Sequence, residues 1–178
     1  MTDESVGEGP TGEVAGRVVA CVVEGMADHS PGGRETAQQL PGTDDLAPAE
    51  GIWYSLAVVA DAMAGLRSVA GPETVRDLGR RVGRRALRRG DVGPVPARLA
   101  NIDDVYSRDH RGDVGGYAFR RIGERDGRVE CTTPYPCAFD RGFVDGVAAT
   151  QGEELVCFTE VGACRDDGTD RCTYEIQW

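Results

Sequence analysis

The fold of this chain is decided by three segments near its C-terminus: YPCAFDRGFVDG (residues 135–146), ELVCFTEVGAC (154–164) and DRCTYEIQW (170–178). They contain four of the six cysteines. Apolar residues at three- and four-residue spacing predict a helix over residues 137–150, in which Gly142 and Gly146 allow another element to approach closely. The other two segments predict a hairpin with an acidic turn at residues 166–170.

A second predicted hairpin precedes that helix. Residues 117–122 and 128–131 alternate with period two, and the sequence ERDG (124–127) between them carries an Asp-Gly turn signal. The C-terminal part therefore reads ββαββ, which predicts a four-stranded antiparallel sheet with one helix. Together with the helical segments upstream, this predicts an α+β fold, N-terminal helices followed by the sheet.

The upstream half is predicted to be helical. Apolar residues recur at helical spacing in four segments, at residues 13–29, 47–69, 72–89 and 94–110. Residues 1–12 are polar, acidic and rich in glycine, which predicts a disordered tail. We therefore expect a single domain over residues 13–178, with a helical part at about 13–111 and a sheet part at about 115–178.

The cysteines predict a metal site. Cys137 stands at the start of a predicted helix, where unpaired backbone N–H groups favour a thiolate. Cys164 and Cys172 lie on opposite arms of the last hairpin, and Glu160 has the strand parity of Cys164. Three thiolates and a carboxylate would form a closed tetrahedral zinc site. Buried reduced thiols, a Cys164–Cys172 disulfide and an iron–sulfur cluster remain open alternatives.

The same residues resemble the 4-vinyl reductase-like domain, a small-molecule-binding module also found as the sensor half of aromatic-responsive bacterial regulators. The resemblance rests on CAFDRGFVDG (137–146) followed by Glu160, Cys164 and Cys172, and it covers about the last 45 residues. It implies that Cys137, Glu160, Cys164 and Cys172 bind zinc, although the spacing from glutamate to cysteine is one residue longer here than in the family.

In outline, helices followed by an antiparallel sheet also look like the related heme nitric-oxide-binding fold. In that family a histidine holds the heme and a Tyr-x-Ser-x-Arg motif holds the propionates. Here YSR (106–108) has the letters without the spacing, and the histidines are His29 and His110. We expect His110 to be a surface or capping residue at a helix end. The cofactor expected from the sequence is therefore zinc rather than heme.

The charge of the chain is strongly acidic. Its 30 acidic residues outnumber 20 basic ones, the formal net charge is −10, and every basic side chain is an arginine. This composition argues against nucleic-acid or membrane binding and suggests a halophilic protein of haloarchaeal type. No apolar run approaches the roughly 20 residues of a membrane span, and a signal-peptide pattern is missing, so we expect a cytoplasmic protein.

An arginine stripe stands out against this acidic background. It follows the third predicted helix and consists of Arg80, Arg81, Arg84, Arg85, Arg88 and Arg89. One interpretation is a solvated face that pairs with acidic residues of a neighbouring element. The other is a surface that contacts a partner or a nucleic acid.

The leading functional hypothesis is a non-enzymatic, regulatory binding module with a structural zinc site. A small apolar or aromatic ligand would lie between the helices and the sheet, and the signal would pass through a homodimer or a regulatory protein partner. Six aromatic residues are the candidates to line that pocket: Trp53, Tyr54, Phe119, Phe139, Phe143 and Tyr174. The alternatives are an enzyme, or enzyme subunit, acting on a tetrapyrrole vinyl group, and a protein that docks a partner on the stripe Arg80–Arg89.

Overall fold

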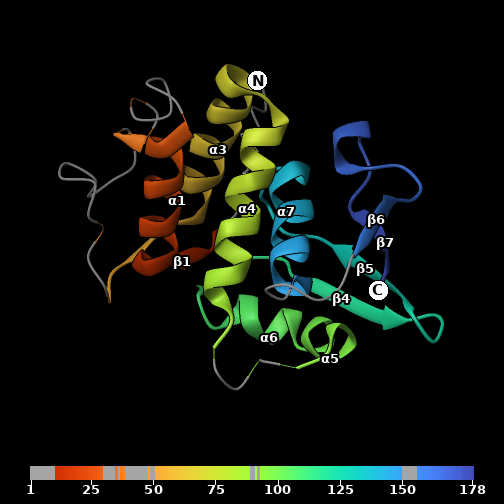
Figure 1. The fold of residues 1–178 in the computed structure, drawn as a ribbon. Helices are drawn as coiled ribbons and strands as arrows, with labels where there is room; N and C mark the ends of the chain where they lie inside the picture. Colours follow the sequence, from red (N-terminus) through yellow and green to blue (C-terminus); the bar gives the residue numbers. More distant parts are fainter. Residues whose placement is uncertain are drawn as a thin grey trace, which may run out of the picture.

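The computed structural model describes residues 11–29, 35, 37–38, 48, 51–88, 91, 93–149 and 156–178. Helices dominate the N-terminal half and a four-stranded antiparallel sheet the C-terminal half, which confirms the predicted α+β class (Figure 1). Among the described residues, no helix has the length and apolarity needed to cross a membrane. The predicted tail lies outside the described residues except for Thr11 and Gly12.

The helical half contains a small sheet that the periodicity did not predict. Its strands are β1 (Glu13–Ala15), β2 (Trp53–Ser55) and β3 (His110–Arg111), in the order β2-β1-β3. Two predicted helices therefore begin later than expected, as α1 (Gly16–His29) and α3 (Leu56–Ala70). Each strand has at most three residues and pairs with segments tens of residues away, so local spacing carries no sign of it.

The fourth predicted helix is divided into α5 (Val95–Ala100) and α6 (Ile102–Ser107). The backbone leaves helical geometry at Asn101, with φ −100° and ψ 9°. Arg98 on α5 is buried and donates hydrogen bonds to the carbonyls of Gly93, Val147 and Ala148. It thereby satisfies carbonyl groups at the end of α7 that have no partner within the helix.

The larger sheet has the order β4-β5-β7-β6, from β4 (Tyr117–Arg121), β5 (Asp126–Cys131), β6 (Cys157–Glu160) and β7 (Cys172–Gln177). Alternate residues of β5 and β7 are buried, including Val129, Cys131, Tyr174 and Ile176. On the other face, the ion pairs Arg128–Glu175 and Arg171–Glu130 cross between the strands. The predicted ββαββ order is therefore correct, with Arg165–Asp167 forming a 3₁₀ turn before β7.

Helix α4 (Pro72–Ala86) stands between α1 and α3 on one side and α7 (Cys137–Ala148) on the other (Figure 1). Glycines allow the two helices to touch. A Cβ atom added at Gly142 would lie 1.9 Å from the carbonyl oxygen of Arg76, and one at Gly79 would lie 2.2 Å from that of Phe139. The prediction that Gly142 and Gly146 permit close approach of another element is confirmed, and α4 is that element.

Candidate functional site: a three-cysteine metal centre

Three buried thiols converge where α7, the 3₁₀ turn and β7 meet. Cys137 is the first residue of α7, Cys164 precedes the 3₁₀ turn, and Cys172 begins β7. The Sγ atom of Cys172 lies 3.1 Å from that of Cys164 and 3.1 Å from that of Cys137, and all three are free thiols within 4.8 Å of one another. Sulfur ligands about 2.3 Å from a zinc ion lie at most about 4.6 Å apart. The three thiols thus have nearly the spacing of zinc ligands.

The protons of the cluster are shared unevenly. The hydrogen bond between Cys137 and Cys172 is the main cause that lowers the pKa of Cys172 and raises that of Cys137, and burial raises the pKa of both. Burial is the main cause that raises the pKa of Cys164 to about 11. The guanidinium of Arg165 also helps to keep Cys172 ionised. A metal ion bound by the three sulfur atoms would displace the protons that the thiols still hold.

Glu160, the fourth ligand predicted from the sequence, stands apart from the three thiols. It is exposed at the end of β6, and its carboxylate interacts with the Cys164 thiol. Both residues, with Cys137, line the same small hollow. The sequence predicts that Glu160 and Cys164 point to the same face of one strand. However, β6 ends at Glu160, and Gly162 turns the chain with a φ of 78°, so Cys164 lies beyond the strand. Cys157, predicted to face away, is exposed.

A buried carboxylate adjoins the cluster and was missed from the sequence. Asp140 is fully buried, and its salt bridge is with Arg165. It accepts hydrogen bonds from the hydroxyl groups of Tyr117 and Thr133, both at 2.7 Å. Burial raises the pKa of Asp140 to about 6. The sequence distance of 25 residues to Arg165 explains the error, since only the tertiary fold brings the pair together.

His110 is also buried, which corrects its prediction as a surface or capping residue. Its Nδ1 atom lies 2.8 Å from the carbonyl oxygen of Tyr106, and its Nε2 atom 2.9 Å from the hydroxyl of Tyr135. The rings of Tyr106 and His110 stack with centroids 3.8 Å apart. Burial lowers the pKa of His110 to about 4, so the imidazole is neutral at pH 7.

The six predicted ligand-lining residues do not gather around one cavity. Phe139 and Phe143 stack within the interior aromatic cluster, with centroids 6.3 Å apart. The other four lie in different places: Tyr174 donates to the Cys137 carbonyl, Tyr54 is buried in the small sheet, Trp53 packs under Arg111, and Phe119 packs against Trp178. Their role in ligand binding stays a prediction.

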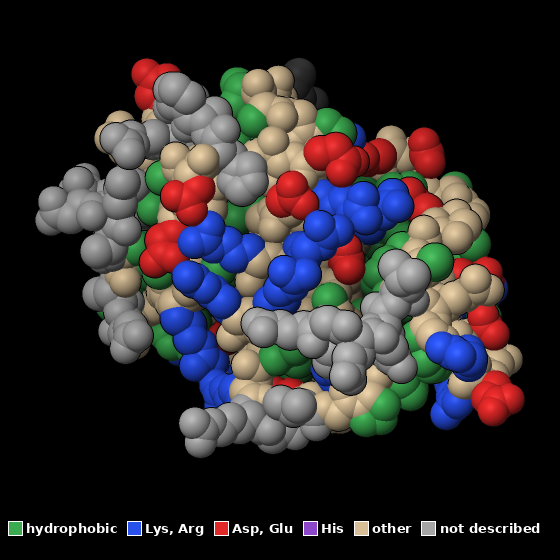
Figure 2. Space-filling view, viewed as in Figure 1, with side chains coloured by type: hydrophobic (Ala, Val, Ile, Leu, Met, Phe, Trp, Pro, Cys, Tyr) green, Lys and Arg blue, Asp and Glu red, His purple; other side chains and the backbone are tan. Residues whose placement is uncertain are grey.

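Arginine side chains form a band across the face shown in Figure 2, and half of the six arginines of the stripe are in ion pairs with other helices. Ion pairs to other helices are Arg80–Asp145, Arg81–Asp28 and Arg85–Glu24. Asp145 on α7 thus pairs across to α4. The side chains of Arg84 and Arg88 form no hydrogen bond or ion pair within the described part of the chain, and Arg89 lies outside it. The solvated, paired face accounts for half of the stripe, and partner binding by the stripe stays a prediction.

Comparisons with known proteins identify the fold. No protein-family model matches the chain, and no curated protein matches it. Solved structures do match. An oxygen-binding H-NOX domain related to soluble guanylate cyclases has a TM-score of 0.62 at 17% identity, over 92% of this chain and 94% of that one. A Tt H-NOX variant has a TM-score of 0.68 at 16% identity, over 92% of this chain and 94% of that one. An H-NOX domain of Shewanella oneidensis in the Fe(II)CO state has a TM-score of 0.66 at 14% identity, over 92% of this chain and 97% of that one.

These matches correct the expectation that heme is not the cofactor, because solved structures that share the fold include heme proteins. The residues around His110 do not fit a heme in the present conformation. Both ring nitrogens already have hydrogen-bond partners, and the Tyr106 ring covers one face of the imidazole. Iron ligation by His110 would require these aromatic groups to move. What the comparisons establish for this chain is the H-NOX fold.

Proposed function

We propose that this chain is a non-enzymatic, small-molecule-sensing domain in which a zinc ion joins the last hairpin to α7. The ligands would be Cys137, Cys164 and Cys172, with Glu160 in the fourth position. The observation that carries the proposal is the convergence of three buried free thiols from three separate segments. The resemblance of these residues to the 4-vinyl reductase-like domain supports it, and the H-NOX fold supports a sensing role.

The charges around the thiols are compatible with a bound zinc ion. Three thiolates and a carboxylate exceed the charge of one zinc ion by two negative charges. The guanidinium of Arg165 lies beside Cys172, and the Arg67–Asp166 ion pair lies at the same hollow. Arg165 would offset part of the excess charge and, through Asp140, connect the metal centre to Tyr117 in the interior.

Elemental analysis tests the metal site. Protein purified without chelator should contain about one zinc ion per chain. Cys172→Ser should lose that zinc and unfold at lower urea concentration, because the hairpin would no longer be joined to α7. Cys157→Ser, which changes an exposed thiol on the same hairpin, should keep both the zinc and the stability of the wild type.

If the wild type contains no zinc, the proposed metal site is wrong and the cysteines are core thiols. Equal loss of zinc from Cys157→Ser would show that the three buried thiols are not its specific ligands. Iron with sulfide, in place of zinc, would assign the thiols to an iron–sulfur cluster.

Heme-dependent gas sensing is the second candidate, and the fold favours it. Absorbance during titration with hemin tests it. A stoichiometric Soret band in the wild type that is lost in His110→Ala would support heme ligation by this histidine. Tyr135→Phe removes the hydroxyl that occupies Nε2 and should strengthen that band. A spectrum that is unchanged in both variants would exclude His110 as the ligand.

The output of the sensor belongs to the same proposal. We infer that the domain signals through a homodimer or a regulatory protein partner. An enzymatic role on a tetrapyrrole vinyl group is the competing reading, and turnover of such a substrate by the purified protein would favour it.

A further inference from the structure

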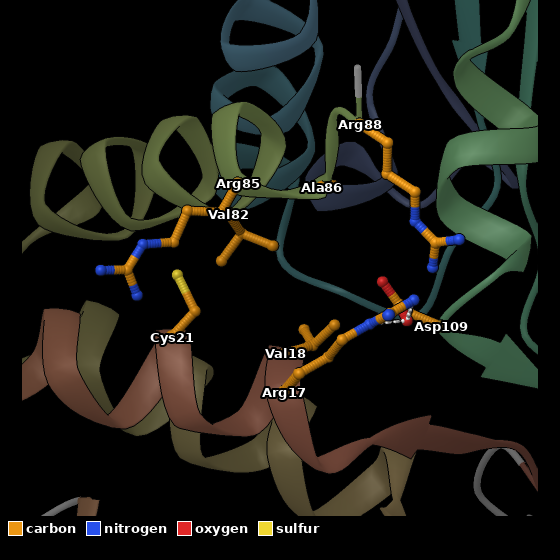
Figure 3. A pocket seen from close by; sticks show the side chains of 8 residues that line it. All are labelled: Arg17, Val18, Cys21, Val82, Arg85, Ala86, Arg88 and Asp109. Atoms are coloured by element: carbon orange, nitrogen blue, oxygen red, sulfur yellow. Dashed lines mark hydrogen bonds and ion pairs between the residues drawn. The ribbon is translucent and has the colours of Figure 1, made fainter. Parts of the chain in front are cut away.

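A separate pocket lies between α1 and α4 (Figure 3). Its volume is about 290 Å³, close to the lower limit for small-molecule sites. The floor is apolar and consists of Val18 and Cys21 from α1 and Val82 and Ala86 from α4. Burial raises the pKa of the Cys21 thiol, so this side chain is neutral and acts as part of the apolar floor.

The rim of this pocket is cationic. It carries three arginines, Arg17, Arg85 and Arg88, and one carboxylate, Asp109. Arg17 pairs with Asp109, and Arg85 pairs with Glu24 at 2.6 Å. Arg88 extends over the pocket toward Arg17 and Asp109 (Figure 3), and its guanidinium forms no hydrogen bond or ion pair with the described residues. The rim therefore holds a guanidinium that makes no direct contact with a described carboxylate and that Asp91 attracts only through its charge.

A neighbouring hollow extends the same cationic rim. It shares Arg17, Arg88 and Asp109 with the first pocket and adds Arg108. The carboxylate of Asp91 pairs with Arg108, with contacts of 2.6 and 2.7 Å, whereas it contacts Arg88 at the backbone amide and not at the guanidinium. In a chain of net charge −10, this concentration of arginines is a local exception.

We propose that this pocket binds a small organic oxyanion with an apolar body. The oxyanion pairs with Arg88 and Arg17, because guanidinium groups bind carboxylate and phosphate oxygens through parallel N–H donors. The apolar body covers Val18, Val82 and Ala86. The inference rests on the proposed sensing function for its biological role and names the ligand class of that sensor. It does not depend on the proposed metal site, whose thiols lie at the start of α7 and on the last hairpin and line no part of this pocket.

Calorimetric titration of the full chain at low ionic strength tests the site, with hexanoate, hexyl phosphate and hexan-1-ol as probes. Hexanoate or hexyl phosphate should bind about tenfold more tightly than the neutral alcohol, because the alcohol cannot form charge-assisted hydrogen bonds. The ratio of the two anions distinguishes a carboxylate from a phosphate ligand. Arg88→Gln should remove the preference for the anions.

Arg84→Gln is the matched control, since Arg84 lies on the same helix, is exposed and lines none of these hollows. It should leave every affinity unchanged. Ala86→Leu, which fills the floor, should weaken all three probes. Absence of anion binding, equal affinity for the alcohol, or equal losses in Arg84→Gln and Arg88→Gln would overturn the proposal. Zinc content measured on the same samples separates this outcome from failure of the metal site.

Discussion

Gly142→Ala is expected to destabilise the protein by at least about 3 kcal/mol, more than most single substitutions. The added Cβ atom would lie 1.9 Å from the carbonyl oxygen of Arg76 and 2.9 Å from the amide nitrogen of Arg80. Both atoms belong to the backbone of α4, so no side chain can rotate away and the two helices must separate. Alanine normally stabilises a helix relative to glycine by about 1 kcal/mol. A loss of stability would therefore reflect the packing of α7 against α4, and a gain would reflect helix propensity.

Urea unfolding followed by circular dichroism measures this effect. Gly93→Ala is the matched control, because its added Cβ atom would meet only the Cβ atom of Ala97, at 3.6 Å. It should leave the unfolding midpoint near that of the wild type. A Gly142→Ala protein as stable as the wild type would contradict the close contact of α4 and α7.

The neutral His110 side chain should make the wild type sensitive to acid. Burial depresses the pKa of His110 from 6.5 to about 4, so between these values the unfolded chain binds more protons than the folded one. Stability from this group is therefore complete above pH 6.5 and is lost as the pH falls toward 4. At pH 4 the loss amounts to about 3 kcal/mol.

His110→Gln isolates this contribution, since glutamine keeps a donor and an acceptor and does not titrate. The free energy of unfolding should fall by about 3 kcal/mol more in the wild type than in the variant between pH 7 and pH 4. The contribution of Asp140 to the pH dependence of stability has the opposite sign, because its raised pKa of about 6 favours the folded state at lower pH. It is present in both proteins and cancels in the difference. Parallel pH profiles would show that His110 does not titrate differently in the folded and unfolded states.

The sequence by itself determined the features that depend on local spacing. Alternation over β4, β5 and β7 and helical spacing over α7 predicted the four-stranded sheet, because each pattern follows from the period of its own element. The predicted grouping of Cys137, Cys164 and Cys172 agrees with the positions of their sulfur atoms. Two of these residues lie on one hairpin, and the third begins the helix next to it, so the spacing constrained where they could meet.

The small sheet, the burial of Asp140 and His110, and the pocket beside Arg88 depend on contacts between segments that are distant in the sequence. The strands β1, β2 and β3 are too short to have a period, and they form only because distant segments supply hydrogen-bond partners. Asp140 and His110 look like surface residues in the sequence, because a polar side chain shows its burial only through partners such as Arg165 and Tyr135. The same holds for the pocket beside Arg88, whose apolar floor and cationic rim come from helices separated by about 60 residues. Burial and pairing between distant segments are properties of the folded chain, and local spacing does not encode them.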